Sequence, residues 1–155
     1  MAKGNPRKLH LTICTDGGSK GNPGPSAAAA VIKDDDGDVL LDGARFLGNT
    51  TNNVAEYRGL ILGLELAAEL KPTAVTIKSD SQLLVRQMAG QYKVKSPALK
   101  PLIVQVQRML GEFESVEIAH VPRGQNTEAD LLVQKAIAKA LEKGKSQEQT
   151  GSGET

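Results

Sequence analysis

The segment Leu9–Pro25 constrains this chain more than any other. Leu9, Leu11 and Ile13 alternate with polar or small residues, the two-residue period of a half-buried strand. The strand leads to Asp16 and then to a turn rich in glycine and proline, which we expect to end it. The backbone amides of such a turn can face an anion, so a cation and a phosphate could meet beside Asp16. Taken alone, an ordinary turn with a solvated Asp16 explains the segment better.

Composition limits the classes of site that are available. With 155 residues the chain fits one domain that can bury a core. Cys14 is the single cysteine, and His10 and His120 lie far apart in sequence, which excludes an internal disulfide and a cysteine-rich zinc site. A net charge of +1 means that a polyanion would have to be held locally, and the low aromatic content argues against base stacking as the main binding mode.

No apolar run reaches membrane-spanning length, and Met1–His10 is polar and basic rather than signal-like. We therefore expect a cytoplasmic monomer that does not bind membranes. Residues 1–7 are expected to form a flexible tail, residues 8–143 one domain, and the polar residues 144–155 a disordered tail.

Hydrophobic periodicity predicts an α/β order of elements. Asp34–Asp38 contains four acids, but Asp-Gly between apolar runs is a hairpin signal, and we interpret it as a solvated turn rather than a metal site. Asn52 or Asn53 is expected to cap the first helix, and Gly59 and Gly63 within it predict close packing on a sheet. Further strands are expected at Ala27–Lys33, Val39–Leu47, Ala74–Asp80 and Val116–His120, and helices at Val54–Leu70, Ser81–Ala89, Pro97–Phe113 and Thr127–Lys143.

Two expected strands end in the same way, with an aspartate at the carboxyl edge. Thr12 and Cys14 share the face of Asp16, and Thr76 and Lys78 share the face of Asp80. The strand, helix, strand order favours parallel pairing with a right-handed crossover. If the two strands are neighbours, both aspartates lie at the edge where open α/β sheets place their ligands.

Glu56 and Asp130 lie in the first turns of two expected helices. Asn53–Glu56 and Thr127–Asp130 both fit a helix-start pattern in which the acid bonds back to the cap, and singly this is the better explanation. Asp80 can likewise be a plain strand end. A shared functional site is favoured when the four acids are considered together, because two strand ends and two helix starts, all acidic, can meet at one sheet edge.

Four carboxylates at contact distance repel one another unless cations lie among them. Oxygen ligands without histidine or cysteine select Mg²⁺ or Mn²⁺ over zinc. Two such ions, roughly 3.5–4 Å apart, can activate an attacking water and stabilise the leaving oxygen of a phosphodiester. The acid set therefore suggests phosphodiester hydrolysis.

Four segments in chain order carry a family resemblance, and each contains one of the acids. Together they resemble the type 1 ribonuclease H family over nearly the whole chain, from about Leu9 to Leu141. The segments are Thr15–Pro25, Thr50–Glu56, Ser79–Gln82 and Asn126–Asp130.

The resemblance implies a ribonuclease H-like α/β fold: a mixed five-stranded sheet, three antiparallel strands then two parallel, flanked by helices. It implies Mg²⁺-dependent cleavage of the RNA strand of RNA–DNA hybrids, leaving 3′-hydroxyl and 5′-phosphate ends. By this likeness Asp16 bridges two metal ions, Glu56 and Asp80 complete one site, and Asp130 completes the other. The residues expected to contact the hybrid are Asn22, Thr51, Asn52, Asn53 and Gln82, with Asn22 and Thr51 holding a DNA-strand phosphate.

The chain departs from the family pattern in two places. Familiar bacterial members carry a basic, tryptophan-containing protrusion, whereas Gly90–Ser96 is short and carries only Lys93 and Lys95. Many members have a histidine in the loop before the last acid, and Pro122–Ala129 has none; Arg123 could contact phosphate or face solvent. The alternatives are a hybrid-binding module without catalysis and another nuclease of the same fold, such as a resolvase or exonuclease.

Overall fold

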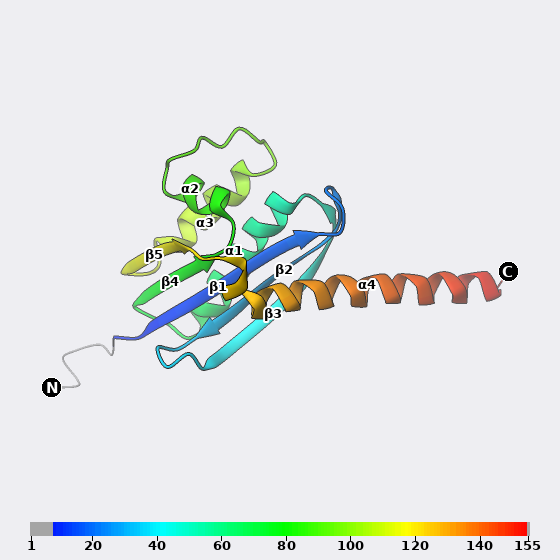
Figure 1. The fold of residues 1–155 in the computed structure, drawn as a ribbon, viewed down its shortest axis with the longest axis horizontal. Coiled ribbons are helices and arrows are strands. Elements are labelled where there is room, and N and C mark those ends of the chain that lie inside the picture. Colours follow the sequence, from blue (N-terminus) through cyan, green and yellow to red (C-terminus); the bar gives the residue numbers. More distant parts are fainter. Residues whose placement is uncertain (1–7, 155) are drawn as a thin grey trace.

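The structure is a computed structural model that describes residues 8–154, with side chains described as far as residue 144. The sheet has the strand order β3-β2-β1-β4-β5, in which β1 pairs antiparallel with β2 and parallel with β4 (Figure 1). The predicted fold class is confirmed, while the expected flexible tail of residues 1–7 lies outside the described residues. The strands are β1 (His10–Ser19), β2 (Gly24–Lys33), β3 (Val39–Thr50), β4 (Ala74–Ser79) and β5 (Ser115–His120).

The central strand β1 is longer than the sequence predicted. We expected the glycines to end it, but Gly17 and Gly18 stay in the sheet and pair with Ala28 and Ala27 of β2. The reason is that a flat, small-residue strand end is needed where a helix packs directly on it, and glycine provides that as well as it provides a turn. Strands β2 and β3 are likewise longer than expected, by three residues each.

The turn between β2 and β3 is the predicted hairpin. One carboxylate oxygen of Asp34 accepts the backbone N–H groups of Asp36 and Asp38, both at 2.9 Å. Gly37 has φ +85°, a left-handed conformation that glycine adopts without strain. The carboxylate of Asp34 therefore has a structural role in closing the turn.

Helix α1 (Asn52–Glu69) begins at a different cap from the one expected. The hydroxyl of Thr51 accepts the N–H of Val54 at 3.2 Å, so neither Asn52 nor Asn53 is the cap. The predicted close packing on the sheet is confirmed, because a Cβ on Gly59 would lie 2.3 Å from the carbonyl oxygen of Asp16.

The second and third helices follow β4 and precede β5 in the sequence. Helix α2 (Gln82–Met88) is capped by Ser81, whose hydroxyl accepts the Leu84 N–H at 3.1 Å. Helix α3 (Lys100–Leu110) begins three residues after Pro97, with Pro101 in its first turn. Residues 90–96, in the segment that joins these two helices, form neither helix nor strand.

The last helix, α4 (Thr127–Glu154), follows a short 3₁₀ helix (Arg123–Gln125) and crosses the face of the sheet opposite α1 (Figure 1). It does not end at Lys143 as predicted but runs on as helix through residues 145–154, which we expected to be disordered. Gly144, Gly151 and Gly153 each disfavour a helix by about 1 kcal/mol relative to alanine, whereas Lys, Gln and Glu residues between Gly144 and Gly151 are good helix formers. That residues 8–143 form the domain, with tails before and after it, stays a prediction.

The two faces of the sheet carry different cores. Leu11 and Ile13 of β1 pack against α1 and α3, whereas Ala27 and Ala29 of β2 pack against Val133 and Ile137 of α4. This alternation places the side chain of Asp16 on the α4 face and its glycine neighbour under α1. None of the helices in the described part of the chain is both long and apolar enough to cross a membrane.

Candidate active site

The four predicted acids line one cavity of about 340 Å³. They come from four separate elements: β1, the second turn of α1, the residue after β4, and the first turn of α4. Glu56 is therefore one turn further into α1 than the sequence predicted, because the helix begins at Asn52. The structure thus brings together Asp16, Glu56, Asp80 and Asp130. The other residues that line the cavity are Gly17, Gly18, Ser19, Asn52, Arg123, Val133 and Gln134.

The register of the sheet places Asp16 beside Asp80. The last pair of the parallel β1–β4 ladder is Thr15 with Ser79, and an aspartate follows each of them. Asp16 is almost buried, with 9% of its surface exposed. The predicted adjacency of the two aspartates at the carboxyl edge is therefore observed.

Glu56 is brought close by the contact of α1 with β1. A Cβ on Gly17 would lie 2.1 Å from the carbonyl carbon of Ala55 and 2.4 Å from the backbone nitrogen of Glu56. No side chain fits between the two elements at this point. Because Thr51 caps the helix, Glu56 is not required for capping.

Asp130 is positioned by the residue that precedes α4. Asn126 is buried, and its side-chain Nδ2 donates to the backbone carbonyl oxygen of Thr15 at 2.8 Å. The backbone carbonyl oxygen of Asn126 accepts the Asp130 N–H at 3.1 Å. Thr127 is the first helical residue and not the residue before the helix, so the capping explanation for Asp130 does not describe this helix start.

The cavity disfavours negative charge on its own carboxyl groups. Burial, followed by the charge of Asp80, raises the pKa of Asp16 to about 7, and Asp130 adds to this rise. Burial also raises the pKa values of Glu56 and Asp80 above their usual range. Arg123 acts in the opposite direction on both of these groups, because a nearby positive charge favours the ionised carboxylate.

These electrostatics fit a divalent cation. Four carboxyl groups with no histidine or cysteine among them form a hard oxygen donor set. Bound cations would offset both the burial and the mutual repulsion that raise the pKa values. Among the described residues, no three of the four acids have carboxylate oxygens that all lie within 4.8 Å of one another, as mutual repulsion would favour. Asp34, Asp36 and Asp38 do meet that spacing, but on the hairpin turn described above.

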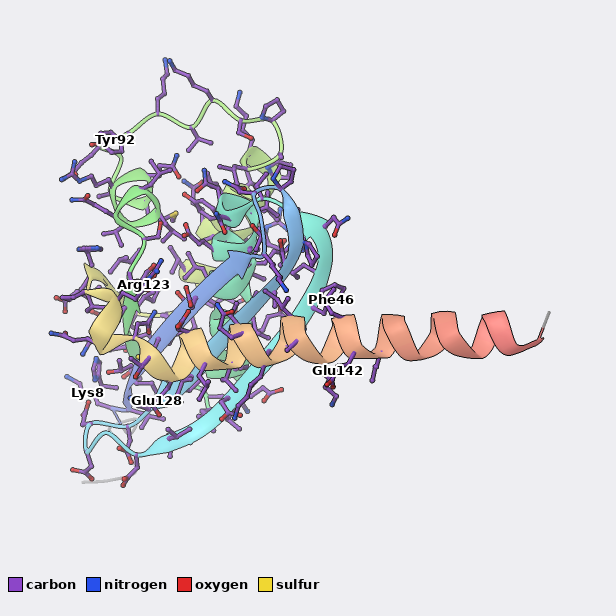
Figure 2. All side chains as sticks on the ribbon, turned by 45° about the vertical axis from the view of Figure 1, so that its right-hand side comes forward. Lys8, Phe46, Tyr92, Arg123, Glu128 and Glu142 are labelled. Carbon is purple, nitrogen blue, oxygen red and sulfur yellow. The ribbon has the colours of Figure 1, made fainter. Side chains whose placement is uncertain are left out.

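Arg123 lies at the rim of the cavity. Its Nε is 3.9 Å from a carboxylate oxygen of Asp80, and 86% of its side chain is exposed. Figure 2 shows it on the short segment that precedes α4. The side chain therefore faces solvent, one of the two alternatives considered from the sequence, while contact with a phosphate stays a prediction.

Two of the predicted substrate-binding amides are linked to each other. The side-chain oxygen of Asn52 accepts the Ser19 N–H at 2.9 Å, and the side-chain oxygen of Asn22 accepts the Asn52 N–H at 3.1 Å. Because the two oxygens are occupied, both NH₂ groups remain to donate hydrogen bonds to a ligand. Only Asn52 of this pair lines the cavity itself.

The remaining predicted contacts lie beside the cavity. Thr51 precedes α1 and its hydroxyl accepts the helix-cap bond. Asn53 and Gln82 are exposed residues at the starts of α1 and α2, next to the elements that carry Glu56 and Asp80. The structure therefore groups them around the cavity without placing them in it.

Sequence reasoning missed Ser19, Gln134 and Asn126. Gln134 follows Asp130 by four residues, so helical spacing alone would have put both on one face of α4. Ser19 was assigned to a turn, although it ends the strand that carries Asp16. No local pattern predicts that Asn126 reaches Thr15, 111 residues away.

A mixed five-stranded sheet with acids from four elements at one edge is the arrangement of ribonuclease H-like proteins. A family model described as "Reverse transcriptase-like" matches residues 14–136. The chain belongs to the type 1 ribonuclease H family.

Individual relatives agree with this assignment. The bifunctional protein Rv2228c of Mycobacterium tuberculosis is 44% identical over 135 residues, which cover 86% of this chain and 37% of that protein. Its N-terminal ribonuclease H domain, solved as a fusion with maltose binding protein, superposes with a TM-score of 0.85 at 43% identity, covering 88% of this chain and 99% of that one. This chain thus spans little more than a third of the full length of Rv2228c.

A second structure was solved with nucleic acid bound. LC11-RNase H1 in complex with an RNA/DNA hybrid gives a TM-score of 0.81 at 42% identity, covering 84% of this chain and 99% of that one. The ribonuclease HI of Halobacterium salinarum is 38% identical over 122 residues, which cover 79% of this chain and 61% of that protein.

Proposed function

We propose that this chain is an endoribonuclease that hydrolyses the RNA strand of RNA–DNA hybrids and leaves 3′-hydroxyl and 5′-phosphate ends. The observation that carries the proposal is the cavity where Asp16, Glu56, Asp80 and Asp130 meet, with the pKa of Asp16 raised to about 7. The relatives named ribonuclease HI and the hybrid complex of LC11-RNase H1 support the choice of substrate.

The proposed cofactors are two Mg²⁺ ions, for which Mn²⁺ can substitute. Asp16 would contact both ions, Glu56 and Asp80 would complete one site, and Asp130 would complete the other. When bound, such ions activate water and stabilise a leaving oxygen. The buried, mutually repelling carboxyl groups support this assignment, because cations are what would allow all of them to ionise at neutral pH.

The chain's own groups would orient the hybrid. Arg123 lies beside Asp80 with an accessible guanidinium, which suits a phosphate oxygen. The amides and hydroxyl expected to contact the wide minor groove and a DNA-strand phosphate are those of Asn22, Thr51, Asn52, Asn53 and Gln82. Amides both donate and accept hydrogen bonds, so they can recognise 2′-hydroxyl groups and base edges.

The proposal extends to a monomer that acts in the cytoplasm. Light scattering coupled to size exclusion tests the oligomeric state: a mass near 16.4 kDa supports a monomer, and a multiple of it contradicts one.

The proposed activity is tested with end-labelled substrates. An RNA–DNA hybrid, an RNA duplex and a DNA duplex are incubated with Mg²⁺, Mn²⁺ or EDTA. We expect cleavage of the RNA strand of the hybrid with either metal, none in EDTA, and none by Asp16→Asn. Asp36→Asn is the matched control, since it removes one acid from the exposed hairpin turn and should cleave like the wild type.

Each other outcome has a clear meaning. Hybrid binding without cleavage would favour the binding module over the nuclease. Cleavage of the DNA duplex in preference to the hybrid would favour a different nuclease of the same fold. Equal cleavage by wild type and Asp16→Asn would remove Asp16 from the reaction altogether.

A further inference from the structure

A second cavity continues from the catalytic one along α4. It has a volume of about 220 Å³, and two of its lining residues, Ser19 and Gln134, also line the cavity of the four acids. A chain-like ligand can therefore pass from one cavity to the other. The complete lining is Ser19, Lys20, Gln134, Ile137, Ala138 and Leu141.

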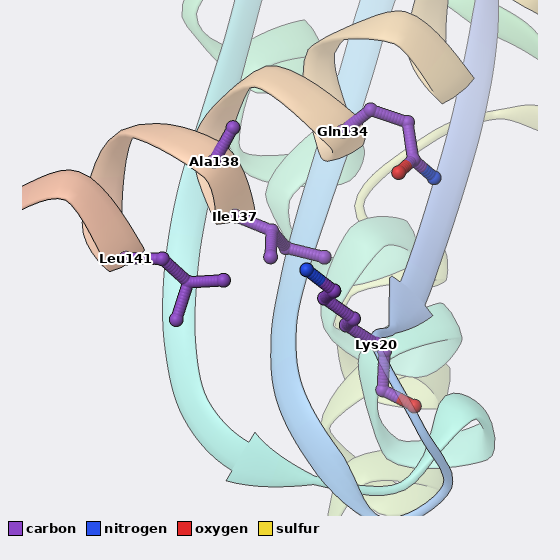
Figure 3. Close-up of a pocket in the computed structure, with 6 residues that line it drawn as sticks. Lys20, Gln134, Ile137, Ala138 and Leu141 are labelled. Atoms are coloured by element: carbon purple, nitrogen blue, oxygen red, sulfur yellow. The ribbon is translucent and has the colours of Figure 1, made fainter.

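The second cavity has an apolar side formed by α4 and a positively charged group on the opposite side. Helix α4 supplies an aliphatic floor of Ile137, Ala138 and Leu141, while the ammonium group of Lys20 extends over that floor from the opposite side (Figure 3). The amide of Gln134 belongs to the lining of both cavities and so lies at the boundary with the cavity of the acids. Among the described residues, no carboxylate lies within 4.0 Å of the Lys20 ammonium, so its charge is available to a ligand.

The backbone around Lys20 is fixed. Its N–H donates to the carbonyl oxygen of Pro25 at 2.8 Å, which closes the turn between β1 and β2. A Cβ on Gly24 would lie 2.1 Å from the Lys20 carbonyl oxygen, so this tight turn requires glycine there. The base of the Lys20 side chain is thus held over α4, and only its outer methylenes and ammonium need to be ordered by a ligand.

We propose that this cavity binds the RNA nucleotide next to the scissile phosphate. Lys20 contacts that nucleotide's phosphate, the aliphatic floor packs against its ribose, and Gln134 hydrogen-bonds its 2′-hydroxyl group. The occupant belongs to the RNA strand because the cavity is continuous with the one that holds the scissile phosphate. This subsite rests on the proposed function and adds a phosphate and ribose contact to it.

The first test measures the salt dependence of binding. Fluorescence anisotropy of a short hybrid is recorded from 50 to 200 mM KCl in an Asp16→Asn background, which prevents cleavage. Lys20→Gln should weaken binding several-fold at low salt and reduce the slope of log K against log salt by about 1, the value for one lost phosphate contact. Lys8→Gln removes the same charge two residues before the start of β1, at the opposite end of the strand from Lys20 (Figure 2). Lys8 lines neither cavity, so this variant should leave the slope unchanged.

Ala138 is exposed on α4, so it can be replaced by either a negative or a positive residue, and the two replacements should change hybrid binding in opposite directions. Ala138→Glu should weaken binding, and Ala138→Lys should strengthen it and steepen the salt slope, since each adds a charge to the cavity in which Lys20 is expected to contact the phosphate. Both replacements are good helix formers, so neither should unfold α4.

Neutral methylphosphonate linkages identify the strand. A single linkage next to the cleavage site in the RNA should weaken binding to the Lys20 protein, but should not weaken it further in Lys20→Gln, because the same contact is already lost. The same linkage in the DNA strand should weaken both proteins equally.

The subsite and the proposed function can fail separately. If the wild type cleaves the hybrid but Lys20→Gln and both Ala138 variants bind like Lys8→Gln, the subsite is wrong and the nuclease stands. The subsite is also wrong if a methylphosphonate linkage in the DNA strand, and not one in the RNA strand, removes the difference in binding between the Lys20 protein and Lys20→Gln. If the wild type neither binds nor cleaves the hybrid, the proposed function fails, and the subsite with it.

Discussion

The Nδ2 group of Asn126 donates a hydrogen bond to the carbonyl oxygen of Thr15 at 2.8 Å, across 111 residues of sequence. This bond joins the start of α4 to the residue before Asp16. Asn126 is 2% exposed, and its own side-chain oxygen has no partner among the described residues. We infer that Asn126 is a positioning residue that sets the distance between Asp16 and Asp130.

Replacing Asn126 should loosen this spacing. Asn126→Ala removes the buried hydrogen bond to the Thr15 carbonyl oxygen, which should cost about 0.5–1.5 kcal/mol of stability. We also expect the Mg²⁺ concentration for half-maximal cleavage to rise several-fold. Thermal denaturation and Mg²⁺ titration of cleavage measure the two effects. A lower Tm with an unchanged Mg²⁺ requirement would show that Asn126 only stabilises the fold.

The contact between α1 and β1 predicts that Gly17 cannot be enlarged. Gly17→Ala would place a Cβ 2.1 Å from the Ala55 carbonyl carbon, so the helix must move away and carry Glu56 with it. We expect cleavage to fall at least tenfold and stability to fall by about 1–3 kcal/mol, as in other overpacked sites. Circular dichroism melts and initial rates on the hybrid provide the measurements.

A matched glycine outside this contact serves as the control. A Cβ on Gly144 would have no atom within 4 Å, and alanine there should stabilise α4 by up to about 1 kcal/mol without changing cleavage. If Gly17→Ala behaved like Gly144→Ala, the close approach of α1 would not be what places Glu56.

The charge of Arg123 predicts a change in the pH profile. Arg123 lowers the pKa values of Glu56 and Asp80, so removing it should raise both. In Arg123→Ala the acid limb of kcat/KM against pH should therefore move to higher pH, while Arg123→Lys should restore part of the difference. An acid limb that stays in place in both variants would limit Arg123 to contact with the substrate.

The raised pKa of Asp16 predicts how metal-free stability depends on pH. Unfolded Asp16 titrates near 3.8 and folded Asp16 near 7, so between these values the folded protein holds a proton that the unfolded chain has released. The free energy of unfolding must therefore fall as pH rises through this window. The full rise in pKa corresponds to at most ~4 kcal/mol.

Asp16→Asn removes this cost. In EDTA the variant should be more stable than the wild type at pH 8 and should lose that advantage by about pH 4, as measured by urea unfolding. Adding Mg²⁺ at pH 8 should stabilise the wild type more than the variant, because a ligand that binds the folded state raises its stability. A variant that is less stable than the wild type at pH 8 in EDTA would indicate a structural Asp16.

The convergence of the acids could be predicted because it depends on long-range rules that the sequence obeys. Strand parity and a parallel crossover put Asp16 beside Asp80, and the pairing of Thr15 with Ser79 confirms this. The glycines of α1 were recognised for the same reason, since Gly59 in a helix interior needs a packing explanation.

Other features depend on contacts that no local pattern encodes. Thr51 and Asn52 can both cap a helix, and the choice of Thr51 follows from Asn52 bonding to Ser19 of β1. Gly17 fits a turn as well as a strand end, and only the packing of Ala55 on it distinguishes the two. The reach of Lys20 over α4 likewise depends on how two distant segments pack.

The most direct measurement is anomalous diffraction from crystals grown with Mn²⁺. We predict anomalous peaks between the carboxyl groups of Asp16, Glu56, Asp80 and Asp130, and their loss in Asp16→Asn crystals. Peaks confined to the hairpin acids Asp34, Asp36 and Asp38, or no peak among the four predicted acids, would contradict the account.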